Sequence, residues 1–175
     1  MPIRQKILLQ PQNTLPDMPI IERLDRTDLL ILQALQHNAR LTNKELAAQV
    51  HLSPTPVFER WRRLEREGFI KRYVTVVDAD KLNQGFIVFC QVKLRQLNTD
   101  IANDFAQRIM QMPEVTECYN ISGHFDYLLK IHSYNMKHYQ QFLLNTLGRI
   151  ESVASIESSF AMDEIKHVHG INITL

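Results

Sequence analysis

Two helix-start signals stand close together in the first half of this sequence and restrict the folds that it can adopt. Thr42 and Glu45 fit a capping box, in which each side chain accepts a hydrogen bond from a free backbone N–H of the first turn. Ser53 and Pro54 fit a second start, since a proline at the first helical position loses no hydrogen bond. Only His51-Leu52 separates the two predicted helices, and so short a link makes them cross steeply, as in a helix-turn-helix unit.

A helix before these two completes a predicted three-helix unit. It starts at Asp25 and ends near Asn38, a residue that tolerates a left-handed backbone. Gly68 ends the last helix, and the apolar run Ile70–Val77 predicts a strand after it. Apolar residues at helical spacing predict the inward faces, which are Leu29, Leu32 and Leu35, then Leu46, Ala47 and Val50, then Val57, Trp61 and Leu64.

The outward face of the helix that starts at Ser53 is rich in arginine. In a DNA-reading helix the N-terminal part reaches base edges in the major groove, and other basic residues contact phosphates. Arginine pairs with guanine, glutamate accepts from cytosine, and threonine or proline contacts the thymine methyl group. The alternative is a solvated helix in which Glu59 and Arg63 form an i,i+4 ion pair. The predicted base contacts are Thr55, Pro56, Glu59 and Arg60, and the predicted phosphate contacts are Ser53, Arg62, Arg63 and Arg66. Asn43 and Lys44 complete the predicted DNA-binding set, in a helix-turn-helix of about residues 43–62.

Charge is divided unevenly along the chain, although the net charge is only +1. Residues 20–75 contain ten Lys/Arg and seven Asp/Glu, which gives +3. Residues 76–175 contain eight Lys/Arg and eleven Asp/Glu, which gives −3. A basic first half suits a polyanionic partner such as duplex DNA, and an acidic second half does not.

Beyond Gly85 the apolar pattern changes from helical spacing to alternation. Strands are predicted at about 90–94, 115–121, 125–131 and 153–162, with helices at about 101–112 and 136–147. The order βαββαβ is that of a ferredoxin-like fold, so the sequence predicts an α+β protein. The predicted inward stripes are Ile101, Phe105, Ile109 and Met112 in the first of these helices, and Met136, Gln140, Leu143 and Leu147 in the second. The last residues, 165–175, are expected to add an edge strand or to pack on a neighbour.

Several other classes of protein are not indicated. No apolar run approaches the roughly 20 residues of a membrane helix, and the N-terminus has no secretion pattern, so we expect a cytoplasmic protein. Cys90 and Cys118 are expected to pack as small hydrophobic residues rather than to form a disulfide. There is no P-loop, nucleophile elbow or zinc signature, and His167 and His169 lack a third ligand, so no enzyme and no metal site is predicted. An enzyme is kept as an alternative, because ferredoxin-like domains host many activities.

Three segments of the sequence resemble the Lrp/AsnC (leucine-responsive regulatory protein) family. The run Leu52–Ile70 is similar to the family's recognition helix, Leu24–Asp28 to its opening, and Ser122–Lys130 to its effector loop. The resemblance covers about residues 22–166 in the family's order. The predicted organisation is a flexible N-terminal arm (1–19), a winged helix-turn-helix domain with a hinge strand (20–77), a linker (78–85) and a ferredoxin-like effector-binding and oligomerisation domain (86–175).

The resemblance implies a sequence-specific DNA-binding transcription regulator that is associated with the nucleoid and has no cofactor. An amino acid or related small molecule is expected to bind it and to shift its assembly or its DNA affinity. The implied partners are double-stranded DNA, this effector, and further copies of the chain, which pair through their sheets as a homodimer and assemble into tetramers or octamers. A ligand-sensing subunit without a DNA-binding role is the second alternative.

Gly123 and Asp126 match the family's glycine-x-x-aspartate loop. A glycine lets a ligand approach the backbone, and Asp126 can accept from an ammonium group or, alternatively, cap its own turn. The resemblance implies that the effector is bound by Asn120, Gly123, His124, Asp126, Tyr127, Met136, Ser159, Phe160 and Ala161. The leucine-responsive members have a larger aromatic residue at the position of Ser159 and an acid at that of His124, so the resemblance does not specify leucine as the effector.

Overall fold

The computed structural model describes residues 24–174, and the predicted flexible arm, residues 1–19, lies outside them. The described chain divides into two compact units, one of residues 24–76 and 166–174 and one of residues 77–165. The sequence predicts that the last residues belong to the second domain, but in the structure they belong to the first unit. Within the described chain, no helix combines the length and the apolar character that crossing a membrane requires.

The first unit contains three helices, α1 (Arg26–His37), α2 (Asn43–Gln49) and α3 (Pro54–Arg66). Asp25 and Thr42 cap α1 and α2 as predicted, and both hydrogen bonds of each capping box are present. Ser53 caps α3 through its backbone position alone, because its side chain makes no capping hydrogen bond. Asn38 is extended (φ −143°) rather than left-handed, since its side chain accepts from the Arg40 N–H and forms a local turn of its own.

The inward faces of these helices form one apolar core. The predicted residues of α2 and α3 are buried, apart from Trp61, which is partly buried. In α1 the buried side is Asp28, Ile31 and Leu35, whereas the predicted Leu29 and Leu32 are only half-buried. The buried face of α1 therefore includes a carboxylate, which an apolar stripe does not predict.

The predicted strand at Ile70–Val77 is not present in the structure. The side chains of Tyr73, Val74, Val76 and Val77 are exposed, and in the described chain no strand pairs with this segment. A strand needs a neighbour for its backbone N–H and C=O groups, so β-favouring residues alone do not form one. The segment is held at one point instead, where Trp61 Nε1 donates to the Tyr73 hydroxyl, which donates to Glu65 at 2.8 Å.

The C-terminal residues lie along α1 without forming a strand. Gln36 Nε2 donates to the Ile171 carbonyl at 2.8 Å, and Gln36 Oε1 accepts from the Ile171 N–H at 3.2 Å. Gln33 Nε2 donates to the Ile173 carbonyl at 2.7 Å. Two glutamine side chains thus take the place that a neighbouring strand has in a sheet.

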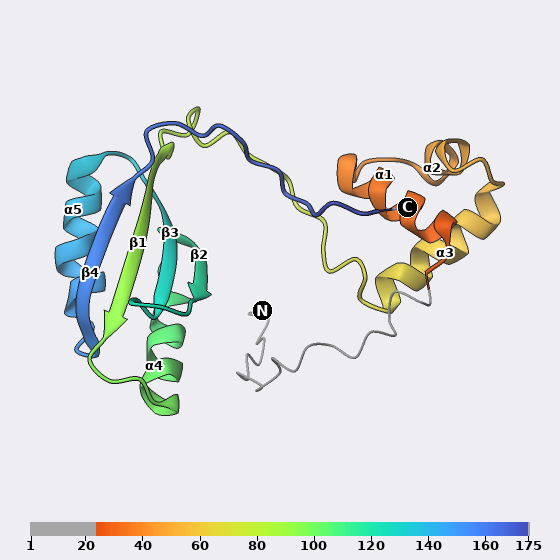
Figure 1. The fold of residues 1–175 in the computed structure, drawn as a ribbon. Coiled ribbons are helices and arrows are strands. Elements are labelled where there is room, and N and C mark those ends of the chain that lie inside the picture. The colour runs from red at the N-terminus through yellow and green to blue at the C-terminus, as the bar shows by residue number, and fades with distance from the viewer. Residues whose placement is uncertain (1–23, 175) are drawn as a thin grey trace. The chain divides into compact units, whose positions relative to one another are not determined.

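The second unit is a four-stranded antiparallel sheet with two long helices. Its elements in chain order are β1 (Phe86–Leu94), α4 (Thr99–Ile109), β2 (Val115–Asn120), β3 (Tyr127–Ser133), α5 (Met136–Asn145), the short 3₁₀ helix η2 (Leu147–Arg149) and β4 (Val153–Phe160). The strands lie in the order β2-β3-β1-β4 (Figure 1). The predicted βαββαβ order, and with it the α+β class, is confirmed.

One face of this sheet packs against the helices. Alternate residues of β1 and β3, such as Val88, Val92 and Leu129, are fully buried against Phe105 of α4 and Phe142 of α5. The uncovered side of β1 carries the residues in between.

The predicted inward stripe of α5 and the residues after it is wrong at its first two positions, whereas Leu147 is buried and Leu143 packs partly buried against the core. Met136 and Gln140 are exposed, whereas Tyr139 and Phe142 are buried. A buried tyrosine needs a partner for its hydroxyl. Here the Tyr139 hydroxyl bonds to the Cys90 thiol at 2.8 Å and also to Ser158, so the aromatic side of the helix can face the core.

Both cysteines are free thiols. Cys90 is fully buried in β1, as predicted for a small hydrophobic residue. Cys118 is exposed, contrary to the prediction, because β2 is an edge strand of the sheet and only partly covered.

Candidate nucleic-acid interface and effector loop

α3 presents most of the predicted DNA contacts on one exposed face. Thr55, Glu59, Arg62 and Arg66 are exposed there. A shallow hollow along this face is lined by Pro56, Phe58, Glu59, Arg60, Arg62, Arg63 and Arg66. Phe58, which the sequence reasoning omitted, is half-exposed and lies 5.8 Å from the Arg62 guanidinium, within reach of a cation–π contact.

The start of α2 is tied to the start of α3. Asn43 Nδ2 donates to the Pro54 carbonyl at 2.9 Å, so this amide fixes the two helices together. Lys44 is exposed. Of the two DNA contacts predicted here, Lys44 is therefore exposed to solvent, whereas the Asn43 amide is hydrogen-bonded within the unit.

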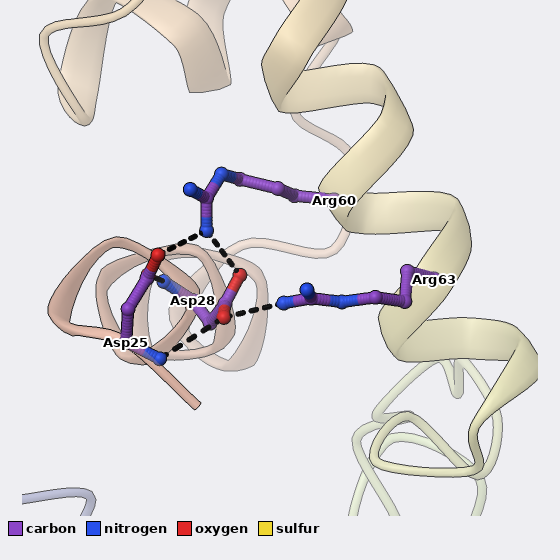
Figure 2. Close-up of polar contacts among 4 residues, drawn as sticks. All are labelled: Asp25, Asp28, Arg60 and Arg63. Carbon is purple, nitrogen blue, oxygen red and sulfur yellow. Dashed lines mark hydrogen bonds and ion pairs between the residues drawn. The ribbon is translucent and has the colours of Figure 1, made fainter. Parts of the chain in front are cut away.

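Two arginines of α3 point at the N-terminus of α1 (Figure 2). Arg60 Nη1 lies between Asp25 Oδ2 and Asp28 Oδ1, at 2.9 Å from the latter, and Arg63 Nη2 bonds to Asp28 Oδ2. Asp28 is only 1% exposed, and it also accepts from the Asp25 N–H at 3.1 Å as part of the capping box. One buried carboxylate thus caps α1 and binds two side chains of α3.

The electrostatics of this cluster favour its ionised form. Burial alone raises the pKa of the Asp25 carboxyl, but hydrogen bonds from the Asp28 N–H and from Arg60 outweigh burial and hold that pKa below its usual value. Hydrogen bonds to Asp25 and then to Asp28 raise the pKa of Arg60. At neutral pH both groups are charged and attract each other.

The two remaining arginines of the face are freer. Arg62 has an exposed side chain (67%) and a long contact of 3.4 Å with Glu65. Arg66 is exposed and forms no ion pair with any residue in 24–174. These two guanidinium groups, more than those of Arg60 and Arg63, are open to a phosphate.

In the second unit, the turn between β2 and β3 carries the predicted effector loop. Gly123 has φ +127°, in the region that favours glycine, and a Cβ placed there would meet no atom within 4 Å. His124 is exposed, and its ring packs edge-on against Phe125. The backbone of the loop is therefore accessible beside an imidazole.

Asp126 lies behind this turn and is 5% exposed. Its Oδ1 accepts from Lys93 Nζ at 2.9 Å and its Oδ2 from the Leu94 N–H at 2.8 Å. Burial raises its pKa, but the Lys93 and Leu94 hydrogen bonds outweigh burial and the pKa is lowered. The Asn120 amide donates to the Asp126 carbonyl at 3.1 Å, and Tyr127 is buried against Phe105. The carboxylate therefore already holds the end of β1 to the loop.

The other predicted effector residues lie at the opposite end of the sheet. Strand register places Tyr127 beside Val92, and Phe160 beside Val88. Four residues along a strand span roughly 13 Å. Exposed residues at the Phe160 end are Met136, Ser159, Phe160 and Ala161. Within one chain the structure brings the predicted effector residues together as two groups, not one.

Two residues, one within each site, were not identified from the sequence. In the sequence Asp28 stands only three residues after the predicted helix start at Asp25, and its arginine partners lie more than thirty positions away. In the sequence Lys93 is only one of the polar residues that alternate with the apolar residues of a predicted strand. Neither signal identifies a partner across the fold. In residues 24–174, no group of three His, Cys, Asp or Glu side chains is placed to hold a metal ion.

Comparison with known proteins matches each unit to a family model. Residues 24–71 match the winged helix-turn-helix DNA-binding model, and residues 87–171 match the Lrp/AsnC ligand binding domain. The leucine-responsive regulatory proteins of Klebsiella pneumoniae and Escherichia coli K12 are each 39% identical over 150 residues, which is 86% of this chain and 92% of those proteins.

Two solved structures extend the comparison. A transcriptional regulator from Neisseria meningitidis, solved as a complex with L-Met, has a TM-score of 0.82 and 38% identity, over 85% of this chain and 96% of that one. An AsnC family transcriptional regulator from Agrobacterium tumefaciens has a TM-score of 0.81 and 32% identity, over 85% and 97% of the two chains.

Proposed function

Because the chain belongs to the Lrp/AsnC family of DNA-binding transcription regulators, we propose that it reads duplex DNA with α3 and that an amino acid controls this binding. The observation that carries the first part is the exposed basic face of α3, in a helix-turn-helix whose helices are fixed by two capping boxes and by Asn43. Thr55, Pro56 and Glu59 at the start of α3 are proposed to meet base edges, with Ser53 at a phosphate.

Arg62 and Arg66 are proposed to neutralise phosphates. The test is a binding titration with duplexes that the wild-type protein selects from a random library, against scrambled duplexes of the same length. Arg62→Ala and Arg66→Ala should weaken both kinds of duplex alike and lower the slope of log affinity against log salt by about one each. Arg108→Ala, an exposed arginine of the second unit, is the matched control. Unchanged salt slopes in both α3 variants would contradict the assignment.

The second unit is proposed to bind an amino acid. The Neisseria relative binds L-Met, so L-methionine is the first ligand to try. Since the predicted residues form two groups in one chain, we propose that a site is completed when the loop group of one copy (Asn120, Gly123, His124, Asp126 and Tyr127) meets the Met136 and Ser159–Ala161 group of another. Each Asp126 oxygen takes one hydrogen bond here and keeps a second lone pair for an ammonium group.

Thermal shift with each of the common amino acids tests this proposal, since a ligand that binds only the folded protein raises the melting temperature. His124→Ala should reduce the shift given by the bound amino acid. His37→Ala, an exposed histidine of α1, should leave the shift unchanged. No shift with any amino acid would contradict the effector class.

Assembly is proposed to use the sheet face that the helices leave uncovered. Phe89 (38% exposed) and Tyr119 (53% exposed) lie on this face, with Lys130 paired to Glu117 between them. Such a face buries its aromatic residues when it meets a second copy of itself. Homodimers, and tetramers or octamers built from them, follow from this proposal, as do pseudo-palindromic DNA sites.

We further infer that the chain is not an enzyme. Its relatives are named as regulators, and the residues proposed for the amino acid are suited to bind it rather than to react with it. An amino-acid sensor without DNA binding is the competing function, and the basic face of α3 argues against it. The relatives are bacterial regulators, and bacterial DNA lies in the cytoplasm. We therefore propose that this chain is cytoplasmic and associated with the nucleoid.

A further inference from the structure

We propose that Asp25 and Asp28 are positioning residues for a base-reading arginine: they hold one nitrogen of Arg60 and leave its other donor edge free for a guanine. The inference rests on the proposed DNA reading by α3. It assigns to the N-terminus of α1 a part in sequence discrimination, although α1 itself need not touch DNA.

The geometry of Arg60 carries the proposal. Its Nη1 is bound by both carboxylates, from Asp25 and Asp28. Figure 2 shows the remaining nitrogens of the guanidinium pointing away from both carboxylates. The side chain is 30% exposed, and neither remaining nitrogen is buried without a partner. Nε–H and one Nη2–H lie on the same edge of a guanidinium and form the fork that matches guanine O6 and N7.

The neighbouring arginine is held differently. Arg63 uses its Nη2 on Asp28, and its Nε is buried without a hydrogen-bond partner. The Nε–Nη2 edge of Arg63 is thus not available to a base. Of the two arginines, Arg63 secures α3 to α1, whereas Arg60 presents a complete donor edge.

Holding the guanidinium in advance matters because a free arginine loses rotamer freedom when it binds. Immobilising a long side chain at an interface opposes binding, and a group that is already fixed avoids this loss. Two carboxylates also cancel much of the positive charge of the arginine, so it contributes less to the non-specific attraction of phosphates and relatively more to base discrimination.

Asp25→Asn tests the proposal with the least disturbance to the fold. Asp28 is buried between two arginines, so its replacement threatens the unit itself. Asp25 has a 51% exposed side chain, and asparagine caps helices as well as aspartate does. The variant keeps an acceptor for the Asp28 N–H but places an amide opposite Arg60. Thermal melting followed by the fluorescence of Trp61 checks that the unit is folded.

The measurement uses duplexes selected by the wild-type protein, each base pair of the site replaced in turn, and a scrambled duplex. We expect Asp25→Asn to lower affinity for the selected duplex roughly tenfold, to flatten the preference at one base pair, and to leave the scrambled duplex nearly unchanged. Arg60→Lys should do the same, because lysine keeps the charge but has no fork. Asp104→Asn, a carboxylate with a 50% exposed side chain paired with Arg108 in the second unit, is the matched control.

A double-mutant cycle separates positioning from general stabilisation. In the Arg60→Ala background, Asp25→Asn should have no further effect on discrimination. The inference is overturned if the loss persists in that background, or if Asp25→Asn weakens selected and scrambled duplexes equally. If the wild-type protein binds both duplexes alike, the proposed function fails and the inference with it. If it discriminates but Asp25→Asn matches Asp104→Asn, only the inference fails.

Discussion

Two buried carboxylates, one in each unit, connect elements that are distant in the sequence. Asp28 joins the first turn of α1 to two arginines of α3, and Asp126 joins the β2–β3 turn to Lys93 and Leu94 at the end of β1. A charge that is removed from water is tolerated only when partners replace the water. Both sites meet this condition with charge-assisted hydrogen bonds.

The charge on Asp126 should contribute stability that depends on pH. Its pKa in the folded chain lies below the reference value of 3.8, so the contribution is complete above that value and is lost as the pH falls through the lowered folded pKa. Lys93 is more than a third exposed, and solvent screens its share. We expect Asp126→Asn to lower the free energy of unfolding by about 1–2 kcal/mol at neutral pH. The difference from wild type should shrink as the pH falls below 3.8 in urea titrations. A difference that stays constant over this range would contradict the account.

At the scale of single elements, the helix ends differ in what their caps contribute. Thr42 accepts from the Glu45 N–H while Glu45 accepts from the Thr42 N–H at 2.7 Å. Ser53 stands at the same position of α3 but makes no side-chain hydrogen bond, and α3 starts on a proline instead. A hydroxyl residue at the N-cap position therefore precedes both helices, but only in α2 does its side chain make a capping hydrogen bond.

This difference can be measured directly. Thr42→Ala should destabilise the first unit by about 1 kcal/mol, the usual loss for a bonded N-cap, and Ser53→Ala should be close to neutral. Urea denaturation followed through Trp61, the only tryptophan, reports on this unit alone. Equal losses in the two variants would show that the Ser53 hydroxyl contributes in the same way.

Elements whose signals are local were predictable, and those that depend on partners were not. The caps at Asp25 and Thr42, the end of α3 at Gly68 and the βαββαβ order are written in neighbouring residues. The predicted strand at 70–77 failed because strand formation depends on a neighbour. The first half of the α5 stripe, Met136 and Gln140, was wrong because Tyr139 can face the core once Cys90 and Ser158 bond to its hydroxyl.

The same reasoning applies to the candidate site. The spacing of residues in α3 predicted its arginine-rich outward face. It did not predict the ion pairs of Arg60 and Arg63 with Asp25 and Asp28, because ion pairs between distant residues leave no periodic pattern in the sequence. The resemblance likewise implied a single set of effector residues. The register of the sheet separates this set into two groups within one chain, and no sequence pattern shows that separation.

For the whole molecule, assembly through the uncovered sheet face is open to a direct test. Phe89→Asp replaces an aromatic side chain at the centre of that face by a carboxylate, and removing a charge from water opposes association. We expect the variant to have a lower mass in sedimentation or light scattering at the same concentration, with its circular dichroism unchanged. Leu144→Asp, at a residue 71% exposed on α5, is the control. An identical mass for wild type and Phe89→Asp would place the interface elsewhere.

The contribution of the C-terminal residues to the first unit is also testable. Gln36→Ala removes two hydrogen bonds to Ile171, and Gln33→Ala removes one to Ile173. Because these groups are near solvent, we expect a loss of about 1 kcal/mol for the double variant, seen as an earlier urea midpoint of Trp61 fluorescence. Gln140→Ala on the exposed side of α5 should not change that midpoint.

This return of the chain onto α1 has a consequence for the order in which the protein is made. Residues 24–76 are made before the second unit, yet the unit that they form also contains residues 166–174, which follow it. Domains generally fold as they emerge during synthesis. The backbone groups that Gln33 and Gln36 bind are therefore made only after the whole second unit. A chain shortened after β4 would keep all four strands of the second unit but would lose the backbone groups that Gln33 and Gln36 bind in the first unit.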